Sequence, residues 1–424
     1  MTKTALNIAI VGAGMGGLTA AITLGQQGHR VTVFERTAVL RPVGSAISVW
    51  PNGVKVLRAL GLGERIDAIS GRMHSMRYCD KSGQSLTSFS LEPLYQGSDE
   101  GARPISRTLL QQTLLAAAQS IAGNQVKLGT ACVDFVQDDD GVEVLLANGS
   151  RVRVDVLVIA DGSRSAMRSK VVGQDITRSY RGYVNWNGRV AVSPDLADAH
   201  EWLQFVGDGK RVSLMPMGDD EFYFFFDVPL PIGTENARSS YREELLAHFS
   251  GWAAPVQTLI QRMDPELVAR VEIHDTTPLP SLVNKRVALL GDAAHAMTPD
   301  LGQGGCQAME DAWVLAECLT SESNAPEKAL LAYQSARCER VGSIVARART
   351  RAELIHGSAF AIGRPLDEED DTAVDTGHVK TNADRNADGA VSDATTAWYA
   401  ELAQENGDAI IAGLLKTVKG GPLP

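Results

Sequence analysis

The order of hydrophobic and polar positions predicts a strand, a helix and a second strand at the start of the chain. Residues 6–11 form a short apolar run typical of a buried strand, and small or apolar residues then recur at helical spacing over residues 18–25. Residues 31–34 form a second apolar run. A strand–helix–strand order of this length indicates a parallel pair of strands joined by a right-handed crossover.

Two later apolar runs, residues 156–160 and 287–290, predict further buried strands of the same sheet. If all of these strands share one sheet, the domain that contains it is discontinuous and the intervening segments build another structure. Residues 211–217 and 221–228 alternate between apolar and polar positions, as antiparallel strands do, and residues 218–220 predict the loop of a hairpin between them.

The last part of the chain changes from helical patterns to a polar segment and back. Residues 308–319 and 329–355 predict helices. Residues 363–396 are polar, acidic and nearly free of large apolar side chains, which predicts a mobile surface loop. A helical pattern resumes over residues 397–418.

A glycine-rich turn joins the first strand to the first helix. Gly12, Gly14 and Gly17 fit the pattern G-x-G-x-x-G, in which the glycines permit a tight turn, approach of a pyrophosphate and close helix–strand packing, respectively. The N-terminus of the helix adds free N–H groups and a favourable dipole. Glu35 lies at the end of the second strand, where a carboxylate can accept hydrogen bonds from ribose hydroxyls. Taken alone, Glu35 is also consistent with an ordinary solvated carboxylate. Together these features predict a dinucleotide-binding domain.

Later motifs distinguish a flavin from a nicotinamide dinucleotide. Asp292 follows a buried strand, where it can accept a hydrogen bond from a ribityl hydroxyl. Residues 299–306 read Pro-Asp-Leu-Gly-Gln-Gly-Gly-Cys and open a helix, so that backbone N–H groups and a helix dipole would face a flat ring and stabilise negative charge on a reduced flavin. Residues 161–165 form a simple turn in isolation, but before Arg168 they would brace the pyrophosphate region. The occurrence of these motifs together favours an FAD site over ordinary glycine-rich turns without a ligand.

The composition narrows the remaining possibilities. With 424 residues, 44% of them hydrophobic, the chain can build two or three domains with sizeable cores. A formal net charge of -11 disfavours binding to nucleic acid or an anionic membrane, and no apolar run approaches the roughly 20 residues of a membrane span. The five cysteines and eight histidines show no C-x-x-C motif or metal spacing, so we expect no metal site and a cytoplasmic location.

The three motifs, in this order, resemble those of the flavoprotein aromatic hydroxylases of the p-hydroxybenzoate hydroxylase type. The resemblance extends to about Ile355. Residues 42–53, 182–188, 209–216 and 222–229 look like a narrower group, the FAD-dependent urate hydroxylases of bacterial purine catabolism. The tail from Ala397 is also similar, whereas the acidic segment 363–396 is longer than is usual in that group.

The resemblance implies a role for each candidate site residue. Those expected to bind FAD tightly are Gly12, Gly14, Gly16, Gly17, Glu35, Arg36, Ser48, Arg107, Val133, Asp292, Gly302, Gln303, Gly304, Gly305 and Cys306. Those expected to contact substrate are Asn185, Arg211, Gly302, Gln303 and Gly304, with Arg211 and Tyr223 as the catalytic candidates.

Strand geometry permits Arg211 and Tyr223 to act on one ligand, on one condition. If residues 218–220 form a three-residue loop, Arg211 opposes Asp227 and Met215 opposes Tyr223. Arg211 and Tyr223 then project to the same side of the sheet, roughly 13 Å apart along it. A loop of two or four residues would place them on opposite faces.

Simpler interpretations stay open for the same side chains. For Arg211 the simpler interpretation is a surface ion pair with Asp227, and for Tyr223 it is a core residue with a solvated hydroxyl. Asn185 would close a turn. We expect His295 to make a structural hydrogen bond rather than to act as a base.

The resemblance implies a single-component monooxygenase. NADH would reduce FAD, O2 would add at the flavin C4a position, and the hydroperoxide would deliver oxygen to C5 of anionic urate, giving 5-hydroxyisourate. The planar fork of Arg211 suits a flat anion. An alternative is a flavin hydroxylase of a phenolic or pyridine carboxylic acid, and a third is a flavin-binding sensor without turnover. The preference for NADH over NADPH rests on the resemblance alone, and a monomer and a homodimer are equally compatible with the sequence.

The fold class predicted is α/β, with a Rossmann-type FAD-binding domain interleaved with a mixed or antiparallel β-sheet substrate domain, followed by C-terminal helices. The FAD-binding domain is expected at residues 1–75, 100–180 and 280–330, the substrate domain at 76–99 and 181–279, and the C-terminal helical region at 331–424.

Overall fold

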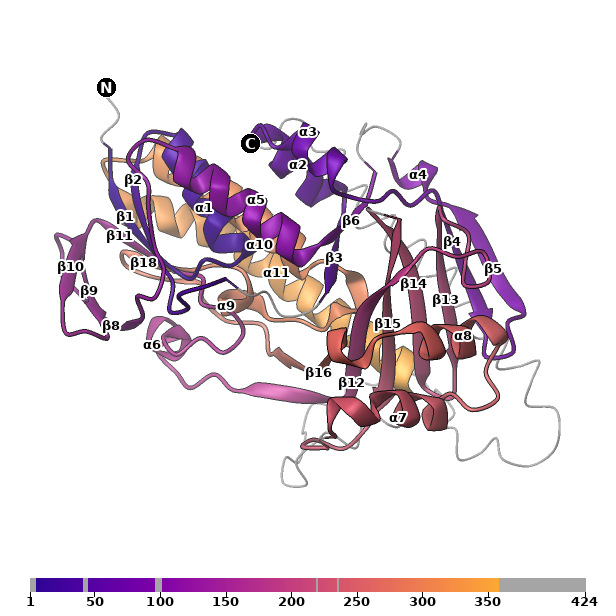
Figure 1. Cartoon of the computed structure of the whole chain (residues 1–424). Coiled ribbons are helices and arrows are strands. Elements are labelled where there is room, and N and C mark those ends of the chain that lie inside the picture. The colour runs from indigo at the N-terminus through magenta and orange to yellow at the C-terminus, as the bar shows by residue number, and fades with distance from the viewer. Residues whose placement is uncertain (1–4, 41–44, 96–100, 219, 235, 358–424) are drawn as a thin grey trace. The chain divides into compact units, whose positions relative to one another are not determined.

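The computed structural model describes residues 5–40, 45–95, 101–218, 220–234 and 236–357 (Figure 1). The acidic segment 363–396 and the predicted helix 397–418 lie outside the described residues. The described residues divide into two compact units: unit 1 comprises those within 5–71, 101–179 and 274–351, and unit 2 those within 72–95, 180–273 and 352–357.

Unit 1 contains the predicted sheet, whose strands are parallel except for the antiparallel strand at one edge. Its strands, in spatial order, are β17 (Val283–Asn284), β18 (Val287–Leu289), β11 (Val156–Ile159), β1 (Asn7–Val11), β2 (Arg30–Phe34) and β7 (Gln125–Lys127). The apolar runs predicted from the sequence form β1, β2, β11 and β18, so the expectation of one shared sheet is confirmed. β1 pairs with β2 on one side and β11 on the other, and ligands of open α/β sheets bind where connections diverge in this way.

Helices and smaller sheets complete unit 1. The helices are α1 (Met15–Gln26), α2 (Pro51–Ala59), α3 (Gly63–Ala68), α5 (Arg107–Ser120), α6 (Arg168–Val172), α9 (Asp292–His295), η3 (Pro299–Leu301), α10 (Gly304–Ser321) and α11 (Pro326–His356). The smaller sheets are β3 (Ala46–Val49) with β6 (Arg103–Ser106), and β8 (Cys132–Gln137), β9 (Val142–Leu146) and β10 (Arg151–Val154). α1 packs against both α5 and α10 (Figure 1). Because the helix is covered in this way, most of its own residues are small or apolar and buried.

α11 belongs largely to unit 1. The sequence placed residues 331–424 in a separate helical region, but the part of α11 up to Arg351 clusters with unit 1. Its buried Arg337 forms ion pairs with α10, and such pairs between distant segments leave no periodic signal in the sequence.

Unit 2 is built on a mixed sheet. Its strands, in spatial order, are β16 (Ala269–Thr276), β12 (Arg178–Ala191), β15 (Glu221–Pro229), β14 (Lys210–Met217), β13 (Glu201–Gly207), β4 (Ser75–Asp80) and β5 (Ser85–Ser90). β4 and β13 are parallel, whereas β13, β14, β15 and β12 pair antiparallel in turn. The helices are α4 (Glu92–Tyr95), η1 (Arg238–Ser240), α7 (Tyr241–His248), α8 (Ala254–Arg262) and η2 (Pro265–Leu267). The predicted α/β fold class is confirmed.

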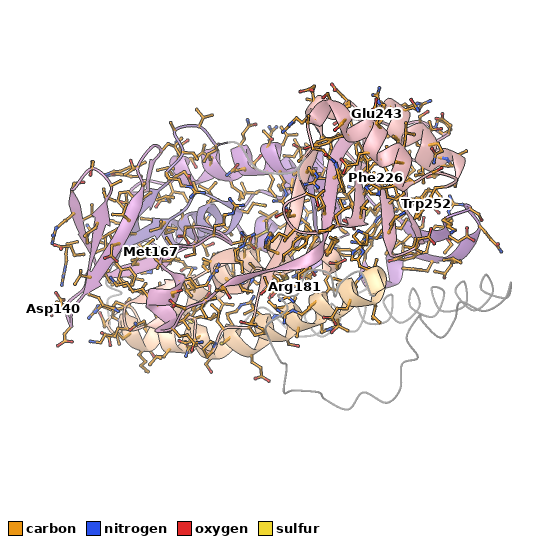
Figure 2. All side chains as sticks on the ribbon, turned by 90° about the horizontal axis from the view of Figure 1, so that it is seen from below. Asp140, Met167, Arg181, Phe226, Glu243 and Trp252 are labelled. Atoms are coloured by element: carbon orange, nitrogen blue, oxygen red, sulfur yellow. The ribbon has the colours of Figure 1, made fainter. Side chains whose placement is uncertain are left out.

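The two faces of the unit 2 sheet differ because side chains alternate along each strand. Phe222, Phe224 and Phe226 are buried with side chains of α7 and α8 in one apolar core. Figure 2 labels Phe226 and Trp252 of this core and Glu243, which is exposed on α7. The intervening strand positions face the other side of the sheet and carry the polar residues predicted for the site.

Candidate active site

The glycine turn between β1 and α1 allows only glycine at two of its positions. Gly12 has φ +106°, and a Cβ there would lie 2.3 Å from the carbonyl oxygen of Ala160. A Cβ on Gly17 would lie 2.1 Å from the carbonyl oxygen of Gly12, so this glycine lets α1 pack against the turn. A Cβ on Gly14 would meet no atom within 4 Å. The open side of Gly14 is the space that a pyrophosphate needs to approach the helix N-terminus.

Glu35, the expected ribose ligand, forms a hydrogen bond to the glycine turn. Its Oε2 accepts a hydrogen bond from the Ala13 amide at 2.9 Å, and its Oε1 accepts from Thr37. Arg36 is exposed at the same strand end. Gln111, which sequence reasoning missed, donates from Nε2 to the Ala13 carbonyl oxygen at 2.8 Å. The available signal was its position one helical turn after Arg107, on the same face of α5.

Three more residues expected to bind FAD lie in or directly beside the small sheets of unit 1. Ser48 pairs with Pro104 across β3 and β6. Arg107 starts α5 and donates from Nε to the Ala46 carbonyl oxygen at 3.1 Å. Val133 is the extra residue of a β-bulge in β8 and its side chain is 55% exposed. A bulged residue is left out of the regular ladder, which suits the predicted contact of its backbone with adenine.

The loop before α10 is tightly packed around its glycines. Gly302 is left-handed at φ +62°, and a Cβ there would lie 2.7 Å from Trp50 Nε1. A Cβ on Gly305 would lie 2.5 Å from Ile47 Cδ1. A Cβ on Gly304 would lie 3.8 Å from Asp292 Oδ1, so the exposed Asp292 carboxylate is close to this loop. Asp292, the residue expected to bind the ribityl chain, therefore lies close to the loop expected to hold the flavin ring.

Cys306 anchors this loop and shows no sign of redox chemistry. Its Sγ accepts a hydrogen bond from the Trp50 amide at 3.3 Å. Burial raises the pKa of the Cys306 thiol to about 12, so it is protonated at neutral pH.

Arg168 ties the turn at residues 161–165 to α9. The buried guanidinium donates to carbonyl oxygens on both segments, at 3.4 Å (Gly162), 3.1 Å (Ser163), 2.8 Å (Asp292) and 2.5 Å (Ala293). Burial lowers the pKa of Arg168 and raises the pKa of Asp161. The structure thus gives Arg168 a bracing role between two of the three sequence motifs.

His295 makes a buried structural hydrogen bond, as expected. Its Nε2 lies 2.7 Å from Asp311 Oδ2, and Asp311 also accepts from the Gly291 amide at 3.0 Å and from Arg337 Nε at 2.7 Å. Burial raises the pKa of Asp311, but His295 and Arg337 outweigh this effect and hold it well below its ordinary value. This arrangement fixes the start of α9, which carries Asp292.

In unit 2, the register across β14 and β15 is the predicted one. Arg211 opposes Asp227 and Met215 opposes Tyr223, and residues 218–220 connect the strands. Arg211 Nη2 lies 2.6 Å from Asp227 Oδ2, and Arg211 Nε lies 2.8 Å from the same atom. The side chains of Arg211 and Asp227 are only 4% and 0% exposed. The ion pair of the simpler interpretation therefore exists, but it is buried and does not lie on the surface.

Asn185 and Asn187 extend this pair along β12. Asn185 Nδ2 donates to Asp227 Oδ1 at 2.7 Å, and Asn187 Nδ2 donates to Asn185 Oδ1 at 2.8 Å. Sequence reasoning singled out Asn185 but not Asn187, although two-residue spacing places both on one strand face. Asn185 lies within a strand and does not close a turn.

Aromatic side chains border the ion pair on the same strand face. The guanidinium carbon of Arg211 lies 5.1 Å from the centre of the Phe225 ring, and the half-buried Tyr223 ring lies 5.9 Å from the same ring. A cation beside flat aromatic surfaces suits a planar, electron-rich ligand. Phe225 was not among the predicted residues, and its two-residue spacing from both Tyr223 and Asp227 was the available signal.

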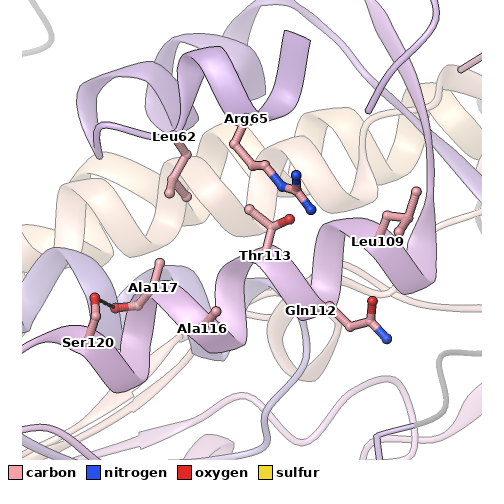
Figure 3. A pocket seen from close by; sticks show the side chains of 8 residues that line it. All are labelled: Leu62, Arg65, Leu109, Gln112, Thr113, Ala116, Ala117 and Ser120. Atoms are coloured by element: carbon pink, nitrogen blue, oxygen red, sulfur yellow. Dashed lines mark hydrogen bonds between the residues drawn. The ribbon is translucent and has the colours of Figure 1, made fainter. Parts of the chain in front are cut away.

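A separate groove of about 430 Å³ lies between α3 and α5 (Figure 3). Its lining residues are Leu62, Arg65, Leu109, Gln112, Thr113, Ala116, Ala117 and Ser120. None of these is a predicted site residue. Within the described ranges, no helix is long and apolar enough to cross a membrane. The same part of the chain holds no group of three His, Cys, Asp or Glu side chains suited to a metal ion.

Comparison with known proteins identifies the family. The model of the FAD binding domain family matches residues 5–348. A FAD-dependent urate hydroxylase of Klebsiella pneumoniae is 42% identical over 415 residues, covering 98% of this chain and 99% of the relative. That of Mycolicibacterium vanbaalenii is 42% identical over 421 residues, covering 99% and 98%. The crystal structure of Klebsiella pneumoniae HpxO complexed with FAD and uric acid has a TM-score of 0.82 at 41% identity, covering 99% of this chain and 98% of that one. The chain therefore belongs to the FAD-dependent urate hydroxylase family.

Proposed function

We propose that this protein hydroxylates urate at C5 to 5-hydroxyisourate, with FAD as its cofactor, NADH as reductant and O2 as oxidant. The observation that carries the proposal is the buried Arg211–Asp227 pair beside Phe225, in a chain 42% identical over nearly its whole length to FAD-dependent urate hydroxylases. A monomeric or homodimeric state and a cytoplasmic location stay predictions.

The residues of unit 1 fit FAD. The open side of Gly14 and the N-terminus of α1 suit the pyrophosphate, Glu35 suits the ribose and the bulge at Val133 suits adenine. We assign the exposed Asp292 to a ribityl hydroxyl and the backbone N–H groups of the loop before α10 to the flavin ring. When bound and reduced, FAD supplies the chemistry that activates O2 and transfers one oxygen atom.

Arg211 is held in place by its neighbours on the strand face. Asp227 accepts from its Nε and Nη2 atoms, and Asn185 holds the other oxygen of Asp227. Because these partners set the guanidinium plane before a ligand arrives, the orientation costs little at binding. We propose that Arg211 binds anionic urate in its plane and that Tyr223 orients the purine, which keeps C5 electron-rich and accessible.

A phenolic acid is a second candidate substrate, because one relative points to it. The 3-amino-4-hydroxybenzoate 2-monooxygenase of Streptomyces cremeus is 33% identical over 362 residues, covering 84% of this chain. Arg211 would then pair with a carboxylate. The lower identity and shorter coverage favour urate.

A substrate panel separates these candidates. The FAD-loaded protein is mixed with NADH or NADPH in air, and the loss of urate, 3-amino-4-hydroxybenzoate or 4-hydroxybenzoate is followed together with peroxide. We expect loss of urate alone, faster with NADH. Loss of a benzoate with urate unchanged would transfer the proposal to phenolic acids. Lasting reduction of FAD without loss of any substrate would favour a sensor.

A further inference from the structure

The loop before α10 contains a helix of a single turn, which needs support from outside. η3 (Pro299–Leu301) has three residues, and its own backbone hydrogen bond runs from the Gly302 amide to the Pro299 carbonyl oxygen at 2.9 Å. One such bond does not compensate for the entropy of ordering the residues of a turn, so a single 3-10 turn is unstable in isolation. Its conformation must therefore be set by contacts with the rest of unit 1.

α11 supplies such contacts at both ends of the turn. Thr298, the residue that precedes η3, donates from Oγ1 to the Ala348 carbonyl oxygen at 2.9 Å. At the other end, the Asp300 carbonyl oxygen accepts from Arg351 Nε at 3.0 Å. Ala348 and Arg351 are three residues apart on α11, so they lie on one face of the helix. This face of α11 thus holds η3 at its start and at its end.

Burial prevents water from replacing these two hydrogen bonds. Thr298 is 1% and Arg351 is 5% exposed. A hydrogen bond from a guanidinium to a carbonyl oxygen is stronger than one between neutral groups, and a buried group that loses its partner carries its full desolvation cost. Burying a charge is itself costly. A buried arginine directed at a backbone carbonyl oxygen therefore indicates that the position of this backbone matters.

The segment before η3 is tied to the end of β16, which the same helix braces. The Ala296 carbonyl oxygen accepts from the Thr276 amide at 3.0 Å. Arg349 donates from Nε to Asp275 Oδ2 at 2.9 Å and from Nη2 to the Thr276 carbonyl oxygen at 3.3 Å. Asp275 and Thr276 are fully buried and, like α11 up to Arg351, belong to unit 1. α11 therefore holds the loop both directly and through the end of β16.

The C-terminal end of η3 also meets Trp50. Gly302 follows η3 in the left-handed conformation, and a Cβ there would lie 2.7 Å from Trp50 Nε1. α10 starts two residues later, at Gly304. Because the chain is held from Thr298 to Gly302, the free amide groups of the first turn of α10 have a defined position. These are amide groups that the proposed function assigns to the flavin ring.

We infer that Ala348 and Arg351 of α11 form a clamp that positions the loop before α10 and thereby raises the reduction potential of bound FAD, with Thr298 and Arg351 as positioning residues. The inference rests on the proposed function, in which this loop faces the flavin ring. Amide groups and the dipole at the start of α10 stabilise the negative charge of reduced flavin more than they stabilise oxidised flavin. Because this effect needs close and fixed placement, a loosened loop should favour the oxidised form.

The reduction potential of bound FAD tests the clamp without any substrate. We expect Arg351→Met to weaken the stabilisation of reduced over oxidised FAD about tenfold, which makes the two-electron potential about 30 mV more negative. Thr298→Val keeps the shape of the side chain and removes its hydroxyl, so its shift should have the same sign and be smaller. Arg351→Lys keeps the charge and should recover part of the shift. Reductive titration of the FAD-loaded protein against a reference dye measures each potential.

Two matched variants on α11 separate the clamp from the general stability of the helix. Thr350→Val removes a hydroxyl that donates to the Ala346 carbonyl oxygen at 3.2 Å, at an exposed position. Lys328→Met removes an exposed cation that lies 2.8 Å from Glu322. Both variants should leave the potential of bound FAD unchanged.

An unchanged potential in Arg351→Met or Thr298→Val overturns the inference even if the melting temperature falls, because the contacts then stabilise only the fold. Equal shifts in these variants and in their controls overturn it as well. If Arg351→Met does not retain FAD, Thr298→Val decides between the outcomes. Urate turnover by wild type is measured separately: if it is present while the potentials do not shift, the proposed function stands without the clamp. A wild type that binds no FAD overturns both.

Discussion

Arg211 and Asp227 lie directly opposite each other on β14 and β15 and form a buried ion pair, with Nη2 and Oδ2 2.6 Å apart. Removing two charges from water is costly, so a buried ion pair adds little to the free energy of unfolding. Its more reliable effect is to hold the arginine side chain in one orientation. The pair therefore makes a stronger case for function than for folding, and the two can be separated by mutation.

Arg211→Ala should lower kcat/KM for urate by roughly a hundredfold or more, because the oriented cation is lost. It should also lower the melting temperature, since Asp227 stays buried without its charged partner, at a cost of about 3–5 kcal/mol. Steady-state kinetics and thermal unfolding measure the two effects.

The double variant Arg211→Ala/Asp227→Ala separates stability from function. Removing both charges should recover much of the lost melting temperature but none of the lost turnover. Recovery of turnover together with stability would show that Arg211 acts only through folding.

Tyr223→Phe keeps the ring that lies beside Phe225 and removes the hydroxyl. If the hydroxyl orients urate, turnover should fall about tenfold and a larger share of the NADH consumed should appear as peroxide. The ratio of peroxide to urate consumed is the measurement, and Tyr78→Phe, at a buried position of β4, is the matched control. An unchanged ratio in Tyr223→Phe argues against orientation by the hydroxyl.

The sequence was sufficient for the strand register that places these residues. A three-residue connection and two-residue alternation determine which side chains share a face, so the opposition of Arg211 to Asp227 followed from local rules. The burial of the pair did not follow, because burial depends on what covers the strand face rather than on the strand itself.

Contacts between side chains of distant segments could not be predicted from the sequence. Gln111 reaches Ala13 across 98 residues, and Arg168 reaches Ala293 across 125. Gln111 lies within α5 and Arg168 starts the short α6, and a single polar side chain carries no periodic pattern. The motifs predicted where a flavin would be held, but not the side chains that hold the motifs together.

Arg168→Lys should weaken FAD binding by at least tenfold and lower the melting temperature of the apoprotein. A lysine cannot reproduce the planar donor set that joins Gly162 and Ser163 to Asp292 and Ala293, so carbonyl oxygens lose their partners. Flavin fluorescence during titration measures the affinity. Arg164→Lys, at an exposed position of the turn at residues 161–165, should have little effect. Unchanged FAD affinity in Arg168→Lys would contradict the bracing role.

Asp311 predicts a pH dependence of stability. Its pKa is held well below the ordinary value, so its contribution is complete above the unfolded pKa of about 3.8 and is lost as the pH falls through the folded pKa. The difference in unfolding free energy between wild type and Asp311→Asn should shrink as the pH falls below about 4. Denaturant unfolding from pH 5 downwards measures it, and a difference that grows over this range would contradict the prediction.

The stoichiometry of aerobic turnover is the most direct test of urate hydroxylation by this protein. The FAD-loaded protein is given NADH and urate, and the losses of NADH and urate are followed separately from peroxide and from the decaying hydroxylated product. We expect about one urate to be consumed for each NADH oxidised, with little peroxide. NADH oxidation to peroxide with urate unchanged would contradict urate hydroxylation.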